Sequence, residues 1–516
     1  MSASGQIGRS IRQEPVSSYA SSNSSDRTIL QHVHPHDWRN PEPKDRYNLV
    51  IIGAGPAGIL TALNAAKVGA KVALIERDRL GGACFNVGCV SSKAIIRTSR
   101  LYAEMRNAEN FGAPVPTGIS VDFSAVMERM RLVRARISRR ISAQRLSSMG
   151  VDLYFGEARF DGPEAIVVEG KRLHFKRALI ASGARPAVPE ITGLAKAGYL
   201  TNENVFDLNE CPPRLLVLGS GPLGCELAQA FCRMGSQVTI VQKDPMFLGN
   251  EERDAAQILS DALARDGIEI HLNTEAISVR MEGNQKLVDL VGDDGKSTVT
   301  VDEILVGIGS APNVEGMNLE AARVQYDKDA GIPTNDYLQT TNPRIYAAGD
   351  VCSGTKFPHI ETAAAQLVIH NALFWGRKRL SAMAIPWCTY TDPEIAHVGL
   401  YIKEANAKGI PVKTYTVMMH DVDRAVTDGE DEGFVKIHVR EGTDKILGAT
   451  VAASHAGEMI TELSLAMTAG IGLRALSRVN HPYPTQAQAI KMAADAYLDS
   501  RHRPMRKWLH KQWLAW

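Results

Sequence analysis

The chain has 516 residues, which at roughly 150 residues per domain predicts three or four domains. Hydrophobic residues make up 44% of the sequence and charged residues 22%, which is typical of folded globular proteins. No apolar run approaches the roughly 18 residues that a membrane-spanning helix needs. The formal net charge of +1 argues against a nucleic-acid partner. Seven cysteines are too few for a disulfide scaffold, so we expect a reducing, cytoplasmic location.

The segment 1–45 differs in composition from the rest of the chain. Nine of its first 25 residues are Ser, and it lacks the apolar stretch of a secretory signal. We therefore expect a Ser-rich, disordered extension, although Trp38 and Pro41 are suited to packing on the folded body. A transit peptide is the alternative, which the acidic residues Glu14 and Asp26 do not favour.

An internal near-repeat is the most informative feature of the sequence. Segments 47–77 and 214–243 both read as an apolar strand, a Gly-x-Gly-x-x-Gly turn, an Ala-rich helix and a second apolar strand. The glycines of the two turns are Gly53, Gly55, Gly58, Gly219, Gly221 and Gly224. Such a turn lets backbone N–H groups approach a pyrophosphate at the N-terminus of the helix. Two complete copies predict two dinucleotide sites rather than two ordinary strand–helix–strand units.

The ends of the second strands distinguish the two predicted sites. Glu76 ends the first of these strands, where a carboxylate accepts hydrogen bonds from ribose hydroxyls. The equivalent position of the second copy, 166 residues later, is the neutral Gln242, and Lys243 follows it. A neutral residue does not repel a 2′-phosphate and a lysine attracts one, although Lys243 is equally consistent with a solvated surface position. We expect a slight preference for NADPH over NADH.

The segment 81–96, GGACFNVGCVSSKAII, contains a candidate redox pair. Cys84 and Cys89 are five residues apart, a spacing that on one and a half helical turns can place both sulfur atoms within bonding distance. A helix N-terminus and the nearby Lys93 would lower the pKa of a thiol, as thiol–disulfide exchange requires. The alternative is a pair of buried, inert thiols.

The segment 81–93 resembles the active-site segment of the FAD-dependent pyridine-nucleotide disulfide oxidoreductases. This family includes dihydrolipoamide dehydrogenase, glutathione reductase and mercuric reductase. Four more segments resemble landmarks of the family in the same order, namely ASGARP at 181–186, VGIGSAPN at 306–313, IYAAGDV at 345–351 and YTDPEIAHVG at 390–399. The resemblance extends from Tyr47 to Leu498.

The resemblance implies an α/β fold with two Rossmann-like dinucleotide-binding domains, for FAD and NAD(P), and a C-terminal α+β dimerisation domain. The expected divisions are an extension at 1–45, the first part of the FAD-binding domain at 46–195, the NAD(P)-binding domain at 196–319, the second part of the FAD-binding domain at 320–380, the dimerisation domain at 381–500 and a tail at 501–516. The implied partner is a second copy of the chain in a homodimer, with an active site shared between the subunits.

The resemblance also implies a role for individual residues. Cys89 would lie next to the flavin ring, Cys84 would face the substrate, and Lys93 would lie by the flavin and pair with Glu226. The residues expected to hold FAD and NADPH or NADH are Gly53, Gly55, Pro56, Ala57, Gly58, Glu76, Gly82, Ala83, Lys93, Ala181, Ser182, Gly183, Gly219, Gly221, Gly224, Gln242, Lys243, Gly309, Gly349 and Asp350. The other five cysteines are expected to be packing residues, and no resident metal site is expected.

The sequence departs from the family at the proton-transfer dyad. Many members carry His-x-His-Pro-Thr followed by Glu, whereas residues 481–488 read HPYPTQAQ, with Tyr483 in the His position and Gln488 in the Glu position. A phenol with a pKa near 10 is a poor base at neutral pH. The missing dyad argues against dihydrolipoamide or glutathione reduction. The segment HPYPT at 481–485 resembles the corresponding segment of mercuric reductase. The cysteine pair at the C-terminus of mercuric reductase is missing, because no cysteine follows Cys388.

We therefore expect an enzyme that uses NAD(P)H and FAD to reduce the Cys84–Cys89 disulfide and passes electrons to an unidentified acceptor, with Tyr483 at the catalytic site. Candidate acceptors are a disulfide, a quinone, a reactive chlorine or oxygen species, or a thiophilic metal ion. The alternatives are a dihydrolipoamide dehydrogenase-type enzyme and a slow, membrane-associated flavin redox sensor.

The C-terminal tail differs from the rest of the chain. Segment 501–516 has five of the 58 basic residues, no acidic residue and three of the six tryptophans. Trp508, Leu509 and Trp513 share one face of a predicted helix, so peripheral contact with a membrane is one interpretation. The other is docking of this face on the protein's own surface or across the dimer.

Overall fold

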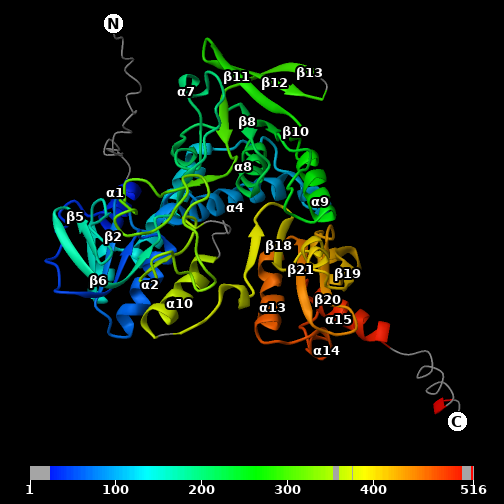
Figure 1. Cartoon of the computed structure of the whole chain (residues 1–516). Helices are drawn as coiled ribbons and strands as arrows, with labels where there is room; N and C mark the ends of the chain where they lie inside the picture. The colour runs from blue at the N-terminus through cyan, green and yellow to red at the C-terminus, as the bar shows by residue number, and fades with distance from the viewer. Residues whose placement is uncertain (1–23, 294, 353–359, 375, 502–512, 515–516) are drawn as a thin grey trace, which may run out of the picture.

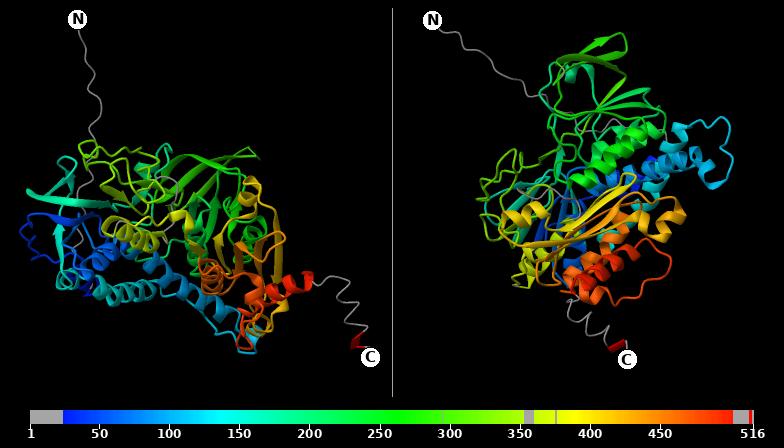
Figure 2. Two further views of the ribbon diagram at one scale, coloured as in Figure 1. Left: turned by 60° about the horizontal axis from the view of Figure 1, so that its bottom comes forward. Right: turned by 90° about the vertical axis from the view of Figure 1, so that its right-hand side faces the viewer.

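The computed structural model describes residues 24–293, 295–352, 360–374, 376–501 and 513–514 (Figure 1). Two mainly parallel sheets and a five-stranded antiparallel sheet organise these residues, and a three-stranded antiparallel sheet and a two-stranded ribbon are smaller. Figures 1 and 2 show three adjoining bodies. No helix in the described part of the chain is both long enough and apolar enough to span a membrane.

The first parallel sheet contains the first glycine turn. Its strands lie in the order β3-β2-β1-β6, and β16 joins β6 in parallel from much later in the sequence. The bounds are β1 (Tyr47–Ile52), β2 (Val72–Glu76), β3 (Val151–Phe155), β6 (Lys171–Ile180) and β16 (Ile345–Ala347). Apart from the first part of β6, where charged and apolar residues alternate, the strands are apolar and mostly buried, as expected for a parallel sheet that is covered on both faces. The antiparallel strands β4 (Arg159–Phe160) and β5 (Ala165–Val168) extend the sheet beyond β6.

Helices pack around this sheet. α2 (Pro56–Lys67) begins directly after the first glycine turn, and α10 (Ile360–Leu373) packs against it. The other helical segments are α3 (Gly82–Asn86), α4 (Cys89–Arg106), η1 (Ala108–Phe111), α5 (Phe123–Ser138), η2 (Arg139–Ile141) and α6 (Ala143–Ser148). The expected single helix through both cysteines is replaced by two helices, because the chain turns at Val87 and Gly88.

The second parallel sheet contains the second glycine turn. Its order is β10-β9-β8-β14, with α8 (Pro222–Arg233) directly after the turn. The bounds are β8 (Arg214–Leu218), β9 (Gln237–Val241), β10 (Glu269–His271), β14 (Glu303–Val306), α7 (Leu194–Ala197), η3 (Val205–Asp207) and α9 (Arg253–Arg265). An antiparallel sheet of β11 (Glu275–Glu282), β12 (Gln285–Gly292) and β13 (Gly295–Val301) projects from this unit (Figure 1). The prediction of two Rossmann-like units is confirmed.

Two short strands mark where the chain passes between these units. β7 (Ala184–Pro186) lies in the outgoing segment and β15 (Ser310–Pro312) in the returning one. They pair in antiparallel fashion, with Ala311 opposite Arg185. Both crossings therefore lie side by side.

The C-terminal part is an α+β unit around a five-stranded antiparallel sheet of order β17-β18-β21-β20-β19. The strands are β17 (Pro386–Thr389), β18 (Glu394–Gly399), β19 (Val412–Met418), β20 (Phe434–Arg440) and β21 (Ile446–Ala453). The helical segments are η4 (Leu380–Ala382), α11 (Ile402–Ala407), η5 (Met419–Asp421), α12 (Asp423–Asp428), α13 (Ala456–Thr468), α14 (Leu473–Leu476) and α15 (Gln488–Arg501). The residue limits of the individual domains stay a prediction.

The N-terminal extension differs from the expectation. Residues 24–45 are folded onto the first unit: α1 (Ser24–Val33) buries Ile29 and Val33, and the Trp38 indole N–H donates to the carbonyl of Leu153 at 3.2 Å. The prediction of disorder is therefore wrong for this part, because a short apolar stripe inside a polar segment finds a place in the core. Residues 1–23 lie outside the described residues.

Candidate functional site

The first glycine turn is open on the side where a phosphate group would bind, at Gly55. It is too crowded for any side chain at Gly53 and Gly58, which pack against the backbone. A Cβ added to Gly53, whose φ is +98°, would lie 2.2 Å from the carbonyl oxygen of Ala181, and one on Gly58 would lie 1.9 Å from that of Gly53. A Cβ on Gly55 would meet no atom within 4 Å, so open space faces the N-terminus of α2. This is the arrangement that dinucleotide pyrophosphates require.

The second turn repeats this geometry. A Cβ on Gly224 would lie 2.3 Å from the carbonyl oxygen of Gly219, whose φ is +100°. The repeat extends to hydrogen bonds: Glu76 accepts from the backbone N–H of Ala54 at 2.7 Å, and Gln242 accepts from that of Ser220 at 3.0 Å. The two strand ends are thus equivalent in structure, and only the charge of the side chain differs.

One cavity of about 2410 Å³ runs along both turns. The predicted site residues that line it are Gly53, Gly55, Pro56, Ala57, Glu76, Gly82, Ala83, Cys84, Cys89, Lys93, Ala181, Ser182, Gly183, Gly219, Gly221, Glu226, Gln242, Lys243, Gly309, Gly349 and Asp350. Gly58 and Gly224 do not line it, because they lie where helix and strand pack together. The open space at both glycine turns and the carboxylate of Glu76 at the end of β2 fit FAD at the first turn and NAD(P) at the second.

The two cysteines face each other in this cavity, where a hydrogen bond joins their side chains. Cys84 lies in α3 and Cys89 is the first residue of α4, whose N-cap is Gly88. A hydrogen bond from Cys84 lowers the pKa of Cys89 to about 7, and the ammonium group of Lys93 lowers it further against the opposing effects of burial and Glu226. Cys89 is therefore partly a thiolate at neutral pH, which exchange chemistry requires.

A buried carboxylate joins three parts of the chain beside this pair. Glu226, 4% exposed and located in α8, accepts from Lys93 Nζ at 2.7 Å through one oxygen. Its other oxygen accepts from the backbone N–H of Tyr390 at 2.8 Å. The Lys93 ammonium also lies 4.5 Å from the centre of the Tyr390 ring. The expected Lys93–Glu226 pair is present, whereas Tyr390 was missed because its contribution is a backbone group and a ring face.

A second buried carboxylate was also missed. Glu251 lines the cavity, accepts from the Tyr401 hydroxyl at 2.7 Å and from the Trp387 indole at 3.2 Å, and burial raises its pKa. His397 lies against both rings, with centroid distances of 3.7 Å to Tyr401 and 4.7 Å to Trp387. This cluster fixes the loop after β9 onto the C-terminal unit. No motif in the sequence indicated it.

Tyr483 is not in the cavity of its own chain. Its side chain is 71% exposed, and its hydroxyl donates to Asp423 at 2.8 Å. The neighbouring His481 has a ring nitrogen 3.1 Å from both carboxylate oxygens of Glu462. The C-terminal unit thus holds a histidine–carboxylate pair, but at different positions from the family dyad.

Of the five remaining cysteines, which were expected to be packing residues, four lie outside the lining of the cavity, and Cys388 lines it. Cys225 and Cys352 are buried, and burial raises the pKa of Cys352 to about 12 and that of Cys232 to about 11. Cys211 contacts Ser236, and Cys388 lines the cavity with a pKa that burial raises. Across the described ranges, no group of three His, Cys, Asp or Glu side chains is arranged to hold a metal ion.

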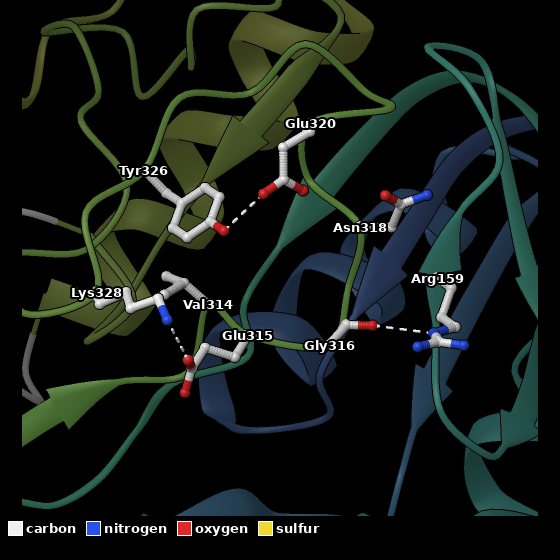
Figure 3. A pocket seen from close by; sticks show the side chains of 8 residues that line it. All are labelled: Arg159, Val314, Glu315, Gly316, Asn318, Glu320, Tyr326 and Lys328. Carbon is white, nitrogen blue, oxygen red and sulfur yellow. Dashed lines mark hydrogen bonds and ion pairs between the residues drawn. The ribbon is translucent and has the colours of Figure 1, made fainter. Parts of the chain in front are cut away.

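A smaller pocket of about 500 Å³ adjoins the large cavity and shares Glu315 and Gly316 with its lining (Figure 3). Its polar groups pair with each other: Lys328 lies 3.0 Å from Glu315, and the Tyr326 hydroxyl donates to Glu320 at 2.7 Å. No residue predicted for the functional site lines it. We therefore place the functional site in the large cavity.

The two glycine turns, the thiol pair and the Lys93–Glu226 pair in one cavity define a nucleotide-dependent oxidoreductase with a redox-active dithiol. Comparison with known proteins agrees. The family described as pyridine nucleotide-disulphide oxidoreductase matches residues 47–366, and its dimerisation domain matches residues 385–494. The chain belongs to this family, and the dimerisation domain supports a homodimer.

Similar proteins include two named enzymes. The chain is 34% identical over 448 residues to a mercuric reductase of Staphylococcus aureus. This match covers 87% of the chain and 82% of that protein. It is 32% identical over 462 residues to a dihydrolipoyl dehydrogenase of Thermus scotoductus, which covers 87% and 97%.

Among solved structures, the HOCl-induced flavoprotein disulfide reductase RclA of Escherichia coli is similar, with a TM-score of 0.77 and 26% identity over 87% of this chain and 99% of that one. Its Cu(II) complex matches with the same TM-score and identity over 88% and 100%. The chain is thus an FAD- and NAD(P)H-dependent oxidoreductase that acts on a disulfide or a thiophilic metal ion.

Proposed function

We propose that the chain transfers electrons from NAD(P)H to the Cys84–Cys89 disulfide and then to a small acceptor, in the first place a thiophilic metal ion. The observation that carries the proposal is the contact between the two thiols in the cavity that both glycine turns line. FAD, when bound, carries the hydride equivalents between the nicotinamide and the disulfide. In the reductive half of each cycle, one NAD(P)H and one proton convert the disulfide into two thiols. In the oxidative half, two electrons pass to the acceptor, for example reducing Hg(II) to Hg(0), two protons are released and the disulfide forms again.

The residues have distinct roles in this proposal. Cys89, the thiol with the lowered pKa, lies on the flavin side, and Cys84 faces the acceptor. Glu226 holds the Lys93 ammonium near the thiolate, where the positive charge stabilises Cys89 after the disulfide opens. The residues that line the cavity at the first turn hold FAD, and those at the second turn hold NAD(P)H.

A soft metal ion suits this site better than a disulfide substrate. A pair of thiols binds soft cations directly, and metal reduction needs no general base to activate a leaving thiol. A disulfide or dithiol substrate needs a proton-transfer group, which the Tyr483 phenol supplies poorly. In the homodimer we place Tyr483 on the acceptor side of the other subunit's cavity. The mercuric reductases and the Cu(II) complex among the similar proteins support this class of acceptor.

The test is NAD(P)H oxidation by the full-length holoenzyme with Hg(II), Cu(II), a quinone, hypochlorous acid, glutathione disulfide and lipoamide as acceptors. We expect stimulation by the metal ions, loss of this stimulation in Cys84→Ser, and no effect of Cys211→Ser, which changes a half-buried cysteine outside the cavity. Equal effects of the two substitutions, or turnover with lipoamide alone, would contradict the proposal.

The second candidate function is that of a dihydrolipoamide dehydrogenase, which the similarity to the Thermus scotoductus enzyme favours. The positions of Tyr483 and Gln488 argue against it. NAD⁺ reduction by dihydrolipoamide separates the two candidates directly, because a metal reductase of this design gives little activity in that assay.

For the tail we propose peripheral contact with an anionic membrane, which its basic residues and tryptophans support. Most of the tail lies outside the described residues. Full-length protein is expected to co-sediment with vesicles that contain phosphatidylserine, less so at high salt, and truncation after Ser500 removes this binding. If truncation instead dissociates the dimer, the tail packs on the protein.

A further inference from the structure

The folded part of the N-terminal extension forms a wall of the large cavity. Asp26, Ile29 and Leu30 of α1 line it, although this helix precedes the first strand of the nucleotide-binding unit. Figure 1 shows α1 beside the sheet that contains β2. The extension therefore contributes to the site, a role that neither glycine turn indicates.

α1 is fixed to the helix α5 and to the core. Ile29 and Val33 are at most 2% exposed and belong to the same core cluster as strands β1 and β2. The Ser25 hydroxyl donates to Glu128 at 3.0 Å, and a ring nitrogen of His32 lies 2.7 Å from the hydroxyl of Ser138. These contacts hold the cavity-facing side of α1 in place.

The C-terminal end of α1 is hydrogen-bonded to the segment that follows β2, the strand that ends at Glu76. The backbone N–H of Leu80 donates to the carbonyl of Val33 at 3.1 Å, and a ring nitrogen of His34 contacts the carbonyl of Asp78. The His34 ring stacks on Phe155 with a centroid distance of 4.3 Å. These partners flank Glu76 in the structure, and Glu76 marks the adenosine end of the first dinucleotide site.

Arg134 of α5 presents an unpaired donor in the same region. Arg134 is only 7% exposed and lines the cavity. Its Nε atom has no hydrogen-bond partner among the described residues. Burial lowers the pKa of Arg134, and the charges of Asp26 and Asp207 counteract this effect. A buried guanidinium donor without an acceptor is costly, so a ligand atom that accepts its hydrogen bond would be stabilising.

We propose that α1 and Arg134 form an additional binding element for the adenosine half of FAD. Leu30, which is only partly buried, gives an apolar surface for the adenine ring, and Arg134 offers a donor to an acceptor atom of the nucleotide. The element slows the release of FAD by closing one side of the cavity. It concerns cofactor retention and does not depend on the proposed acceptor.

Two N-terminal truncations test this proposal. Removal of residues 2–34 deletes α1, whereas removal of residues 2–23 leaves it intact and is the matched control. FAD release from the holoenzyme is measured by the rise of flavin fluorescence after dilution, without NAD(P)H or acceptor. We expect release about tenfold faster for the longer truncation, which corresponds to about 1.4 kcal/mol, and an unchanged rate for the shorter one. Equal rates in both truncations and the full-length protein would overturn the proposal.

Two substitutions in the full-length chain keep the test valid if the longer truncation does not fold. Arg134→Met removes the buried donor and keeps the length of the side chain, and Arg136→Met changes an exposed arginine on the same helix. We expect the dissociation constant of FAD, measured by titration of the apoprotein, to rise about tenfold in Arg134→Met only. Leu30→Ser is expected to act in the same direction. A dissociation constant within twofold of the wild type in both Arg134→Met and Leu30→Ser contradicts a role of this element.

Discussion

The ammonium group of Lys243 lies 2.9 Å from a carboxylate oxygen of Glu275. The side chains are 74% and 53% exposed, so the pair is weak, but it places a negative charge beside the lysine that was expected to attract a 2′-phosphate. Gln242 likewise donates to a carboxylate, that of Asp244, at 2.8 Å. These two carboxylates reduce the positive potential at the second site, which agrees with a mild cofactor preference.

Removal of the Glu275 charge is expected to favour NADPH. We expect the kcat/KM of the wild type for NADPH and NADH to differ by no more than about 100-fold, or about 2.7 kcal/mol. Glu275→Gln should raise the NADPH/NADH ratio about two- to fivefold, and Gln242→Glu should lower it. Glu269→Gln, an exposed carboxylate outside the cavity lining, is the control. A wild type that accepts only NADH contradicts the argument.

The Cys89 thiol is expected to ionise near neutral pH. Its pKa of about 7 depends first on the hydrogen bond from Cys84. Because the thiolate is the nucleophile, alkylation of the reduced enzyme by iodoacetamide should accelerate as the pH rises through about 7. Cys84→Ala removes the hydrogen bond, so the midpoint should move to higher pH. A midpoint above 8.5 in the wild type would show that the cavity does not stabilise this thiolate.

Dihydrolipoamide and glutathione disulfide are expected to be poor substrates. General acid–base groups contribute roughly 10²- to 10⁴-fold to rate, so kcat/KM should be lower than in a dedicated reductase by a factor of this order. Steady-state assays with both compounds measure this deficit. Turnover at the level of a dedicated reductase would mean that another pair, such as His481 and Glu462, transfers the proton, which His481→Gln would then abolish.

Tyr483→Phe tests the role of the phenol. The substitution removes the hydroxyl that donates to Asp423 but keeps the ring. If Tyr483 acts at the acceptor side, metal-dependent NAD(P)H oxidation should fall while the flavin content and the alkylation midpoint of Cys89 stay unchanged. Tyr326→Phe, in the smaller pocket, is the matched control. A loss of flavin in Tyr483→Phe would indicate a structural role.

The C-terminal unit is expected to lose stability in acid through His397. Burial lowers the pKa of this side chain from 6.5 to about 3, so the folded state disfavours the proton that the unfolded chain accepts. Its contribution is complete above pH 6.5 and decreases as the pH falls towards 3, with a loss of about 1.4 kcal/mol at pH 5.5. In urea unfolding at pH 7.5 and 5.5, His397→Gln should show a smaller difference between the two pH values than the wild type. The exposed His420→Gln is the control.

The sequence was sufficient to predict the two dinucleotide units and the redox pair, because local patterns determine them. The glycine turns need particular backbone geometry over six residues, and Cys84, Cys89 and Lys93 lie within ten residues of each other. The Lys93–Glu226 pair spans 133 residues and was expected only through the family resemblance.

Contacts between distant segments were not predictable in this way. Glu251 is buried because Trp387 and Tyr401, more than 130 residues later, offer donors to it, and a single sequence contains no sign of that proximity. We expected disorder over α1 because its segment of the sequence is rich in Ser, whereas the structure buries the apolar residues Ile29 and Val33 of this helix. Whether so few apolar side chains become buried depends on the part of the folded protein against which they pack, here α5 and the core around β1 and β2, and local composition does not reveal it.

The paired strands β7 and β15 make the second nucleotide-binding unit an insertion in the first. The chain leaves through Ala184–Pro186 and returns through Ser310–Pro312, and these segments are hydrogen-bonded to each other. Only this two-stranded ribbon connects the units covalently, while the sheet of the first unit is completed by β16 after the return. The orientation of the second unit relative to the first therefore depends on contacts such as Lys93–Glu226. Without those contacts, the second unit could rotate about the β7–β15 ribbon as a hinge.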